Sequence, residues 1–319
     1  MCKSTKNPKK YLGNIFVLVA LGFVFLVFQL HRSVSHSKIY AGIIGWVWFY
    51  TVFALFLCSF IRCSLSEPGQ VPPYWGFQMG DSESKRKRYC LMCHVFKPDR
   101  CHHCSICSRC VLNMDHHCRN LSTAWINNCI GFYNRKFFIL RLIYSLLSGY
   151  TVLYSLLPAL ISALDILFKS HSLSSSSFLF LLSSLLLILV LITLSKFTVF
   201  HLQLLLKNST TIESLENSYN GKYSLSVSKN LSQVFGNFYI LWAFPVFLKP
   251  GKPLGDGINW PIVGQLSLSS EVNIESDGNG KDPKTKNAEI GERLIEESKT
   301  PVDSETDTSL IRNNPSVSN

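Results

Sequence analysis

The chain has 319 residues, of which 47% are hydrophobic, and its mean hydropathy is +0.19. This apolar content excludes an ordinary soluble domain, because the hydrophobic residues lie in long runs that carry almost no charge. The formal net charge is +11, and residues 265–319 hold 11 acidic and 6 basic residues, so the positive excess lies in the rest of the chain. A basic surface is expected beside anionic lipid headgroups and would also attract a polyanionic cofactor. No nucleic-acid partner is expected.

Four runs are long and apolar enough to cross a bilayer. Three carry no Lys, Arg, Asp or Glu, and the fourth is broken only by Lys196; they are Tyr11–Leu30, Ile39–Ile61, Leu142–Leu164 and roughly Phe178–Phe200. Because a helix of about 20 such residues spans a hydrocarbon core of about 30 Å, the sequence predicts an α-helical polytopic membrane protein with four transmembrane helices. The first run could instead be a signal peptide, but it is long for one and lacks a small-residue cleavage site.

Lysine and arginine orient these helices. Four lysines precede the first helix, eight basic residues lie from Arg62 to Arg109, and the loop between helices three and four holds only Lys169. The positive-inside rule therefore places both termini and the loop after helix two in the cytosol. The predicted organisation is a cytosolic N-terminus (1–10), helices one and two (11–62), a small cysteine-rich zinc domain (63–138), helices three and four (139–206), a cytosolic segment (207–250) and a disordered tail (251–319).

The loop after helix two concentrates potential metal ligands. Eight of the 11 cysteines and five histidines fall between Cys90 and Cys129. In a reducing cytosol such a cluster favours metal over disulfides. Two tetrahedral zinc ions would use eight of these thirteen side chains, and the spacing alone does not choose among the possible partitions. Since little apolar core is available there, we expect short hairpins and knuckles held by metal.

The surplus of ligands includes the sequence Asp115-His116-His117-Cys118. A thiolate is a nucleophile, a neighbouring imidazole can take its proton, and a carboxylate can orient the ring. The sequence therefore indicates a free cysteine that is kept out of the metal for catalysis. The alternative is that the surplus ligands have no role.

Two further features follow along the chain. Pro158 lies in helix three and predicts a kink, which neighbouring membrane helices can tolerate. After helix four, aromatic side chains between residues 235 and 244 predict packing at the membrane interface.

The cysteine-rich block contains a long motif. It reads Cys90-x2-Cys93-x3-Lys97-Pro98-x-Arg100-x-His102-His103-Cys104-x2-Cys107-x2-Cys110-x4-Asp115-His116-His117-Cys118, followed by Trp125-Ile126-Asn127-Asn128-Cys129-Ile130-Gly131. This pattern resembles the cysteine-rich domain of the DHHC family of protein S-acyltransferases (palmitoyltransferases). Three more segments resemble the family's Asp-Pro-Gly, Thr-Thr-x-Glu and C-terminal motifs: Glu67-Pro68-Gly69, Thr210-Thr211-Ile212-Glu213 and Asn230-x2-Gln233-Val234-Phe235-Gly236. The resemblance covers roughly residues 10–250.

The resemblance implies a role for each matching residue. Two structural zinc ions would be held, one by Cys90, Cys93, His103 and Cys110, the other by Cys104, Cys107, His117 and Cys129. Cys101 would not be a ligand. Cys118 would be the nucleophile, with His116 as its base and Asp115 as the partner that orients the ring. Thr211 would support the site near Asp115, and Trp125 would lie near the acyl chain.

The resemblance also implies the reaction. Palmitoyl-CoA, or another long-chain acyl-CoA, would donate its acyl group to Cys118, and the acyl-enzyme would then pass it to cysteine residues of cytosol-facing substrate proteins. The protein would be an integral multi-pass protein of the Golgi, the endoplasmic reticulum or the plasma membrane, with its termini and zinc domain in the cytosol.

One departure from the family pattern lies beside the nucleophile. Family members usually have a single residue between the catalytic Cys and the Trp, whereas residues 119–124 stand here. The five extra residues, 119–123, are a real variation, an inactivating change or an error in the gene model. The alternative function is therefore a catalytically inactive member that acts as a membrane scaffold. A membrane-anchored ubiquitin ligase of the zinc-finger kind is a further alternative, but it gives no reason for Asp115-His116-His117-Cys118.

Overall fold

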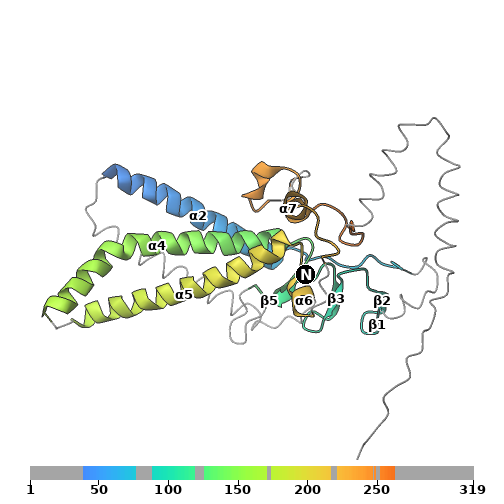
Figure 1. The fold of residues 1–319 in the computed structure, drawn as a ribbon, viewed down its shortest axis with the longest axis horizontal. Coiled ribbons are helices and arrows are strands. Elements are labelled where there is room, and N and C mark those ends of the chain that lie inside the picture. The colour runs from blue at the N-terminus through green and yellow to red at the C-terminus, as the bar shows by residue number, and fades with distance from the viewer. Residues whose placement is uncertain are drawn as a thin grey trace, which may run out of the picture. The chain divides into compact units, whose positions relative to one another are not determined.

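The computed structural model describes residues 39–76, 88–118, 126–170, 174–216, 221–246, 248 and 252–262 (Figure 1). The predicted span Tyr11–Leu30, the extra residues 119–123, Trp125 and the tail beyond residue 262 lie outside these ranges.

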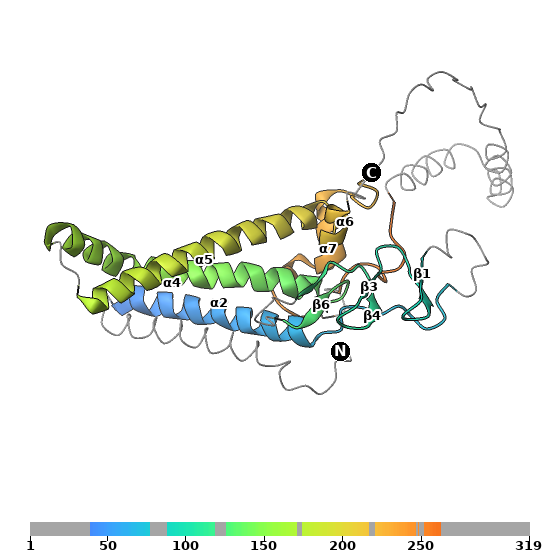
Figure 2. The same ribbon diagram turned by 90° about the horizontal axis from the view of Figure 1, so that it is seen from below.

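Three long helices lie side by side: α2 (Ile39–Leu65), α4 (Arg135–Ser170) and α5 (Ser175–Leu206) (Figures 1 and 2). Among the described residues, these are the three helices that are long and apolar enough to cross a membrane; the qualifying segments are Ile43–Leu65, Arg135–Lys169 and Ser177–Leu206. They correspond to the second, third and fourth predicted spans.

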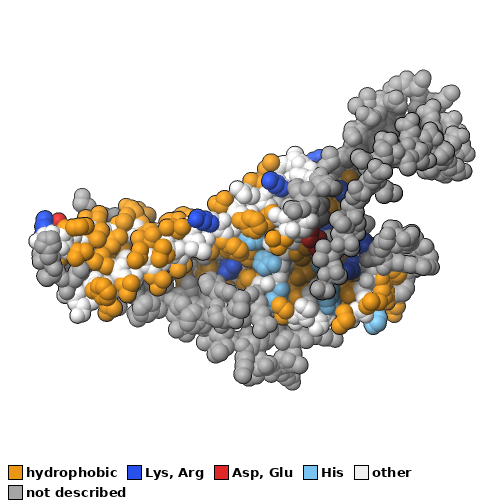
Figure 3. Space-filling view, turned by 60° about the horizontal axis from the view of Figure 1, so that its bottom comes forward, with side chains coloured by type: hydrophobic (Ala, Val, Ile, Leu, Met, Phe, Trp, Pro, Cys, Tyr) orange, Lys and Arg blue, Asp and Glu red, His pale blue; other side chains and the backbone are white. Residues whose placement is uncertain are grey.

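The apolar side chains of these helices are divided between an inner and an outer face. Inside, α2 packs its rings one turn apart: the centroids of Phe49 and Phe53 are 5.7 Å apart, and those of Phe56 and Phe60 6.3 Å. Outside, large aliphatic side chains such as Ile44 and Leu186 stay exposed, and Figure 3 shows hydrophobic side chains over much of the helical part. An apolar surface of this extent is typical of contact with lipid.

Pro158 lies within α4. Figure 1 shows that α4 bends in its distal half, the half that contains this residue. Proline removes one backbone hydrogen bond and its ring crowds the preceding turn, which accounts for a bend of this kind.

The cysteine-rich block forms three two-stranded antiparallel hairpins, as expected for a domain with little apolar core. The first pairs β1 (Tyr89–Cys90) with β2 (Val95–Phe96), the second pairs β3 (His102–Cys104) with β4 (Arg109–Val111), and the third pairs β5 (His116–Cys118) with β6 (Asn128–Ile130). Strands of two or three residues are not stable alone. The Cys and His side chains that these hairpins bring together could hold metal, which would stabilise them.

Three short helices follow α5: α6 (Thr211–Leu215), α7 (Val227–Phe235) and the 3₁₀ helix η1 (Tyr239–Trp242). The amine of Lys136, at the start of α4, donates hydrogen bonds of 2.8 and 3.1 Å to the carbonyl groups of Leu241 and Val246. The rings of Phe235 and Trp242 are 5.5 Å apart. The segment after α5 is thus attached to the beginning of α4.

Candidate active site and metal centres

The two strands of each of the first two hairpins are joined by the same kind of turn. In both Cys-x-x-Cys segments, the residue after the second cysteine has a left-handed backbone: φ is 53° at His94 and 51° at Ser108. The amide of His94 donates to the carbonyl of Cys90 at 2.8 Å, and the amide of Cys107 donates to the thiol of Cys104 at 3.3 Å. This turn brings both thiols of each pair to the same side of the hairpin.

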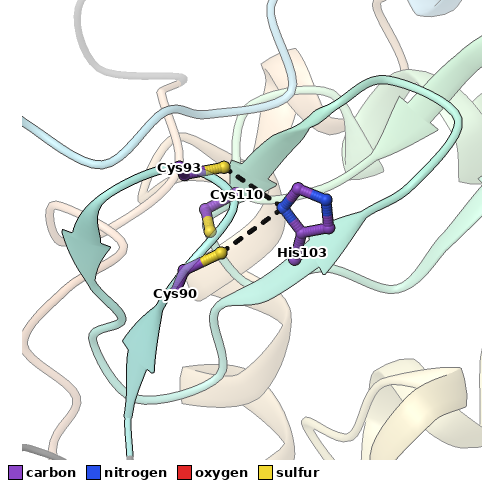
Figure 4. Close-up of side chains that lie close together, drawn as sticks. All are labelled: Cys90, Cys93, His103 and Cys110. Carbon is purple, nitrogen blue, oxygen red and sulfur yellow. Dashed lines mark hydrogen bonds between the residues drawn. The ribbon is translucent and has the colours of Figure 1, made fainter.

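The first donor group contains Cys90, Cys93, His103 and Cys110 (Figure 4). Its side chains point toward one another, with the Nδ1 atom of His103 lying 3.5 Å from the sulfur of Cys90 and 3.1 Å from that of Cys93. Cys110 comes from β4, directly opposite His103 on β3. Two hairpins therefore contribute to one cluster.

The second donor group contains Cys104, Cys107, His117 and Cys129. The Nδ1 atom of His117 lies 3.5, 3.3 and 3.4 Å from the sulfur atoms of Cys104, Cys107 and Cys129, in that order. His117 and Cys129 are direct partners across β5 and β6. This group therefore links the second hairpin to the third.

Both groups fit a zinc ion. Each offers three thiols and one imidazole nitrogen, and the ligand atoms of each group lie within 4.8 Å of one another. In a tetrahedral site with Zn–S of about 2.3 Å and Zn–N of about 2.0 Å, sulfur and nitrogen are about 3.6 Å apart, close to the distances in both groups. These are the two sets implied by the resemblance. Cys101 is buried beside the first group but does not belong to it.

The short strand β5 separates the metal group from the free thiol. Side chains alternate between the faces of a strand, so His117 points to the second donor group, while His116 and Cys118 share the opposite face. Cys118 packs against the apolar cluster to which the inner ends of α2 and α4 contribute, and its thiol is among the groups that raise the pKa of His116. The predicted nucleophile is therefore outside both metal groups.

Asp115 is the buried anchor of this site, with 1% of its surface exposed. Its carboxylate accepts a hydrogen bond of 2.6 Å from His116 Nδ1, and bonds of 3.0 and 2.8 Å from the amide and hydroxyl of Thr211. The guanidinium of Arg135 lies 3.7 Å away, and His201 Nδ1 lies 3.9 Å away. Thr211, which was expected to support the site near Asp115, therefore lies in direct contact with that carboxylate.

These contacts change the titration of Asp115 and His116. Burial alone would raise the pKa of Asp115, but the hydrogen bond with His116 and the charge of Arg135 hold it well below its usual range. Burial favours the neutral ring of His116, yet the hydrogen bonds with Asp115 and Cys118 outweigh it and raise its pKa to about 9. The ring can therefore hold a proton beside the thiol at neutral pH.

Thr211 is positioned by a capping box at the start of α6. The hydroxyl of Thr210 accepts from the amide of Glu213, and the Glu213 carboxylate accepts from the amide of Thr210. The same carboxylate receives two hydrogen bonds from the buried Arg100, at 2.6 and 2.9 Å. The Thr-Thr-x-Glu sequence is therefore a helix cap joined to the zinc domain by an ion pair.

Asn208 and Asn230 fix the chain on either side of α6. Asn208 accepts from Arg100 at 3.1 Å and donates to Gln233 at 2.7 Å. Asn230 donates to the carbonyl of Leu206 at 2.7 Å and accepts from the amide of Leu225 at 2.9 Å. The C-terminal motif thus holds the end of α5 next to Arg100.

The described residues on both sides of the extra segment form a closed hairpin. Cys118 pairs with Asn128, and the amide of Asn127 donates to the carbonyl of Cys118 at 3.2 Å. Asn128 also donates to carbonyl groups at the end of α2, the shortest of these bonds being 2.8 Å to Ser66. The longer connection does not prevent Cys129 from reaching the second donor group.

Two residues beside Asp115 were not singled out from the sequence. Arg135 begins α4 and His201 lies near the end of α5, and in the sequence each is a charged or imidazole side chain near the end of an apolar run. Arg100, which was quoted in the motif without a role, acts through Glu213. Trp125, expected near the acyl chain, lies outside the described residues.

The helices are able to cross a membrane, the two Cys/His groups are able to bind metal, and a free thiol lies beside an imidazole and a carboxylate. Together these features define a membrane protein with a thiol site next to two candidate metal centres. The DHHC palmitoyltransferase family model matches residues 83–218. The chain is 30% identical to probable protein S-acyltransferase 13 of Arabidopsis thaliana, over 83% of this chain and 94% of that protein. It is 41% identical to palmitoyltransferase ZDHHC15A of Danio rerio, over 56% of this chain and 53% of that protein. It is 40% identical to palmitoyltransferase ZDHHC2 of Homo sapiens, over 54% of this chain and 46% of that protein. The chain belongs to the DHHC palmitoyltransferase family.

Proposed function

We propose that this protein is an S-acyltransferase that moves a long-chain acyl group, palmitoyl in the simplest case, from acyl-CoA to cysteine residues of other proteins. The observation that carries the proposal is the Cys118–His116–Asp115 arrangement at the end of the membrane helices. A nucleophile, a proton acceptor and an orienting carboxylate are the parts required for thioester exchange through a covalent intermediate.

The reaction has two steps. Cys118 attacks the thioester carbon of acyl-CoA, its proton passes to His116, and the CoA thiolate leaves with a proton to give acyl-Cys118. A cysteine of the substrate protein then attacks the acyl-enzyme by the same route in reverse, and Cys118 is regenerated. Asp115 keeps the ring of His116 in place through both steps. Since thioester exchange is nearly balanced in energy, catalysis here consists chiefly of positioning and proton transfer.

The apolar cluster beside Cys118 supplies a place for the acyl chain. Cys118 packs against buried side chains of α2 and α4, including Phe60 and Phe138. Each methylene that leaves water contributes about 0.8 kcal/mol, so a long chain gains much more than a short one from entering the helix bundle. Trp125 is a further candidate for this contact.

Bound zinc would hold the hairpins together in this mechanism. Both donor groups consist of four protein ligands, which is the composition of a closed structural site. In the second group the ligand His117 lies between His116 and Cys118. Zinc there would fix the strand that carries the nucleophile and its base.

The membrane arrangement that fits this function has four spans, with Tyr11–Leu30 as the first. The basic loops place the termini, the zinc domain and acyl-CoA on the cytosolic side. The substrate proteins then need a cysteine near the cytosolic surface of the bilayer. Golgi, endoplasmic reticulum and plasma membrane all satisfy this requirement.

The test is acylation of the purified, detergent-solubilised protein by palmitoyl-CoA, with Cys118 read by mass spectrometry. A hydroxylamine-labile adduct on Cys118 is expected, and it should be absent in Cys118→Ser. Asp115→Asn should form the adduct more slowly by about 10²-fold, since it removes the charge that orients His116. A zinc-loaded wild-type protein that forms no adduct would refute the enzyme and favour the scaffold.

A further inference from the structure

Arg141 is a buried cation inside a membrane helix. It lies six residues into α4, about 9 Å beyond Arg135 along the helix axis. Only 6% of its surface is exposed, and its Nε atom has no hydrogen-bond partner among the described residues. Charged side chains at such positions are costly and usually face a functional partner.

In the part of the chain that the structure describes, no carboxylate is paired with this guanidinium. Residues 1–66 contain no Asp or Glu, and Asp165 is the sole acidic residue between Asp115 and Glu213. Asp165 lies about 36 Å further along α4 and pairs with Lys169 at 2.8 Å. The Asp115 carboxylate is already bonded to His116 and Thr211. Among the described residues, no carboxylate forms an ion pair with Arg141, so its guanidinium can donate to an oxygen atom of a bound substrate.

The guanidinium shares an aromatic neighbour with the active site. Its Cζ atom is 5.5 Å from the centre of the Phe138 ring, and the His116 ring is 5.0 Å from the same centre. Arg141 also interacts electrostatically with Cys63, which in turn interacts with Cys118. The aromatic contact stabilises the cation, but a ring face accepts no directed hydrogen bond from the remaining N–H groups.

We propose that Arg141 donates a hydrogen bond to the acyl carbonyl oxygen and stabilises the oxyanion at Cys118. When the sulfur of Cys118 attacks, the carbon–oxygen π pair moves onto the oxygen, and the new negative charge lies near the guanidinium. The pair returns as the carbon–sulfur bond to CoA breaks, and the CoA thiolate takes the proton held by His116. The second step forms and discharges the same oxyanion. This inference rests on the proposed acyl transfer.

A phosphate of CoA is the other anionic oxygen that acyl-CoA brings. The position of Arg141 favours the carbonyl, because the residue is buried over the ring of Phe138, a member of the apolar cluster against which Cys118 packs. A contact with the carbonyl and a contact with a phosphate can be distinguished experimentally. Palmitoyl-N-acetylcysteamine is a thioester without phosphate, so a carbonyl contact acts on it and a phosphate contact does not.

The experiment measures the rate of Cys118 acylation in Arg141→Met, Arg141→Lys and the wild type, with both thioesters. Arg141→Met should lower the maximal rate by about 10²–10³-fold, the usual cost of one lost oxyanion donor, with little change in KM. The loss should be equal for the two thioesters. Arg141→Lys, which keeps the cation, should recover part of the rate. Lys169→Met removes a cation from the exposed far end of the same helix and should change nothing.

Alkylation of Cys118 by iodoacetamide separates the carbonyl from the thiol. This displacement forms no oxyanion, so Arg141→Met should keep the wild-type rate. Three outcomes for Arg141→Met would each overturn the proposal. Alkylation and acylation could be slowed equally, the loss of acylation rate could be confined to palmitoyl-CoA, or the acylation rate could be unchanged. If Arg141→Met loses its zinc, the proposal is tested with Arg141→Lys instead. Slower acylation of Arg141→Lys with both thioesters supports the proposal, and acylation at the wild-type rate overturns it. A zinc-loaded wild type without any adduct would refute acyl transfer itself and this inference with it.

Discussion

The two donor groups have the same ligand types and the same knuckle turns, yet they have different neighbours. The first group packs with Trp75, Phe132 and Trp260, away from the thiol site. The second packs with Met114 and with Ile212 of α6, and its ligands His117 and Cys129 pair across the hairpin that ends at Cys118. The comparison teaches that two donor groups of the same composition can lie in different surroundings: metal in the first group would support the domain, and metal in the second would also hold the strand that carries Cys118.

Removal of a ligand from the second group should have the largest effect. Cys129→Ser should lose one of two zinc ions and lower acylation of Cys118 by about 10²-fold or more, because misplacement of a reacting group by about 1 Å has effects of this size. Zinc is measured by mass spectrometry of the purified protein, and acylation by the adduct on Cys118. Retention of two zinc ions would contradict the assignment of Cys129.

Removal of a ligand from the first group should lower the acylation of Cys118 by a smaller factor. Cys93→Ser should also lose one zinc ion, but acylation should fall by only about tenfold, because no residue of this group lies on β5 or β6. Cys101→Ser is the control and should keep two zinc ions, since Cys101 is buried beside the group without belonging to it. Equal losses in Cys93→Ser and Cys129→Ser would erase the distinction between the groups.

The ion pair between Arg100 and Glu213 connects the zinc domain to the Asp115 site. Arg100→Met leaves a buried carboxylate unpaired and should destabilise the protein by about 3–5 kcal/mol, read as a lower thermal midpoint in detergent. Adding Glu213→Gln should restore part of the loss. A double variant no more stable than Arg100→Met would show that the carboxylate is not the cause.

The same pair predicts a dependence on pH. Burial opposes the charged form of Glu213, but the hydrogen bonds and charge of Arg100 lower its pKa below the ordinary value of 4.5. A lowered pKa gives stability that is present above the ordinary value and lost as the pH falls through the folded-state pKa. The thermal midpoint of the wild type should therefore drop below pH 4.5 more steeply than that of Glu213→Gln.

The smallest effect is expected from deletion of residues 119–123. The hairpin is already closed by Cys118 and Asn128, so shortening the connection should change acylation by less than about threefold, as a change of about 0.6 kcal/mol per doubling of loop length allows. Zinc content should stay at two. A gain of more than tenfold on deletion would mean that the five residues inhibit the enzyme.

The features that could be predicted from the sequence are those formed by residues close together along the chain. The Cys-x-x-Cys spacings predicted metal-held hairpins, and the motif implied the two groups that the structure brings together, because most ligands lie within a few residues of one another. Three of the predicted membrane spans likewise follow from continuous apolar runs.

Contacts between distant residues could not be predicted in this way. Arg100 and Glu213 are 113 residues apart, and Asp115 and Thr211 are 96 apart. The hydropathy pattern also placed the third span at Leu142, whereas α4 begins at Arg135. The basic residues at its start are tolerated because Lys136 donates to backbone carbonyls and Arg135 pairs with Asp115, and neither partner is visible from composition.

The alternation of side chains along β5 has a consequence for reactivity toward electrophiles. His117 points to one face of this strand, and His116 and Cys118 point to the other, so the donor group that zinc would occupy and the free thiol are separated by a single backbone. With zinc bound, a cysteine-directed compound that fits the membrane-side face could modify Cys118 while the thiols on the opposite face stay protected. The strand itself therefore provides the basis for selective covalent inhibition in a domain crowded with cysteines.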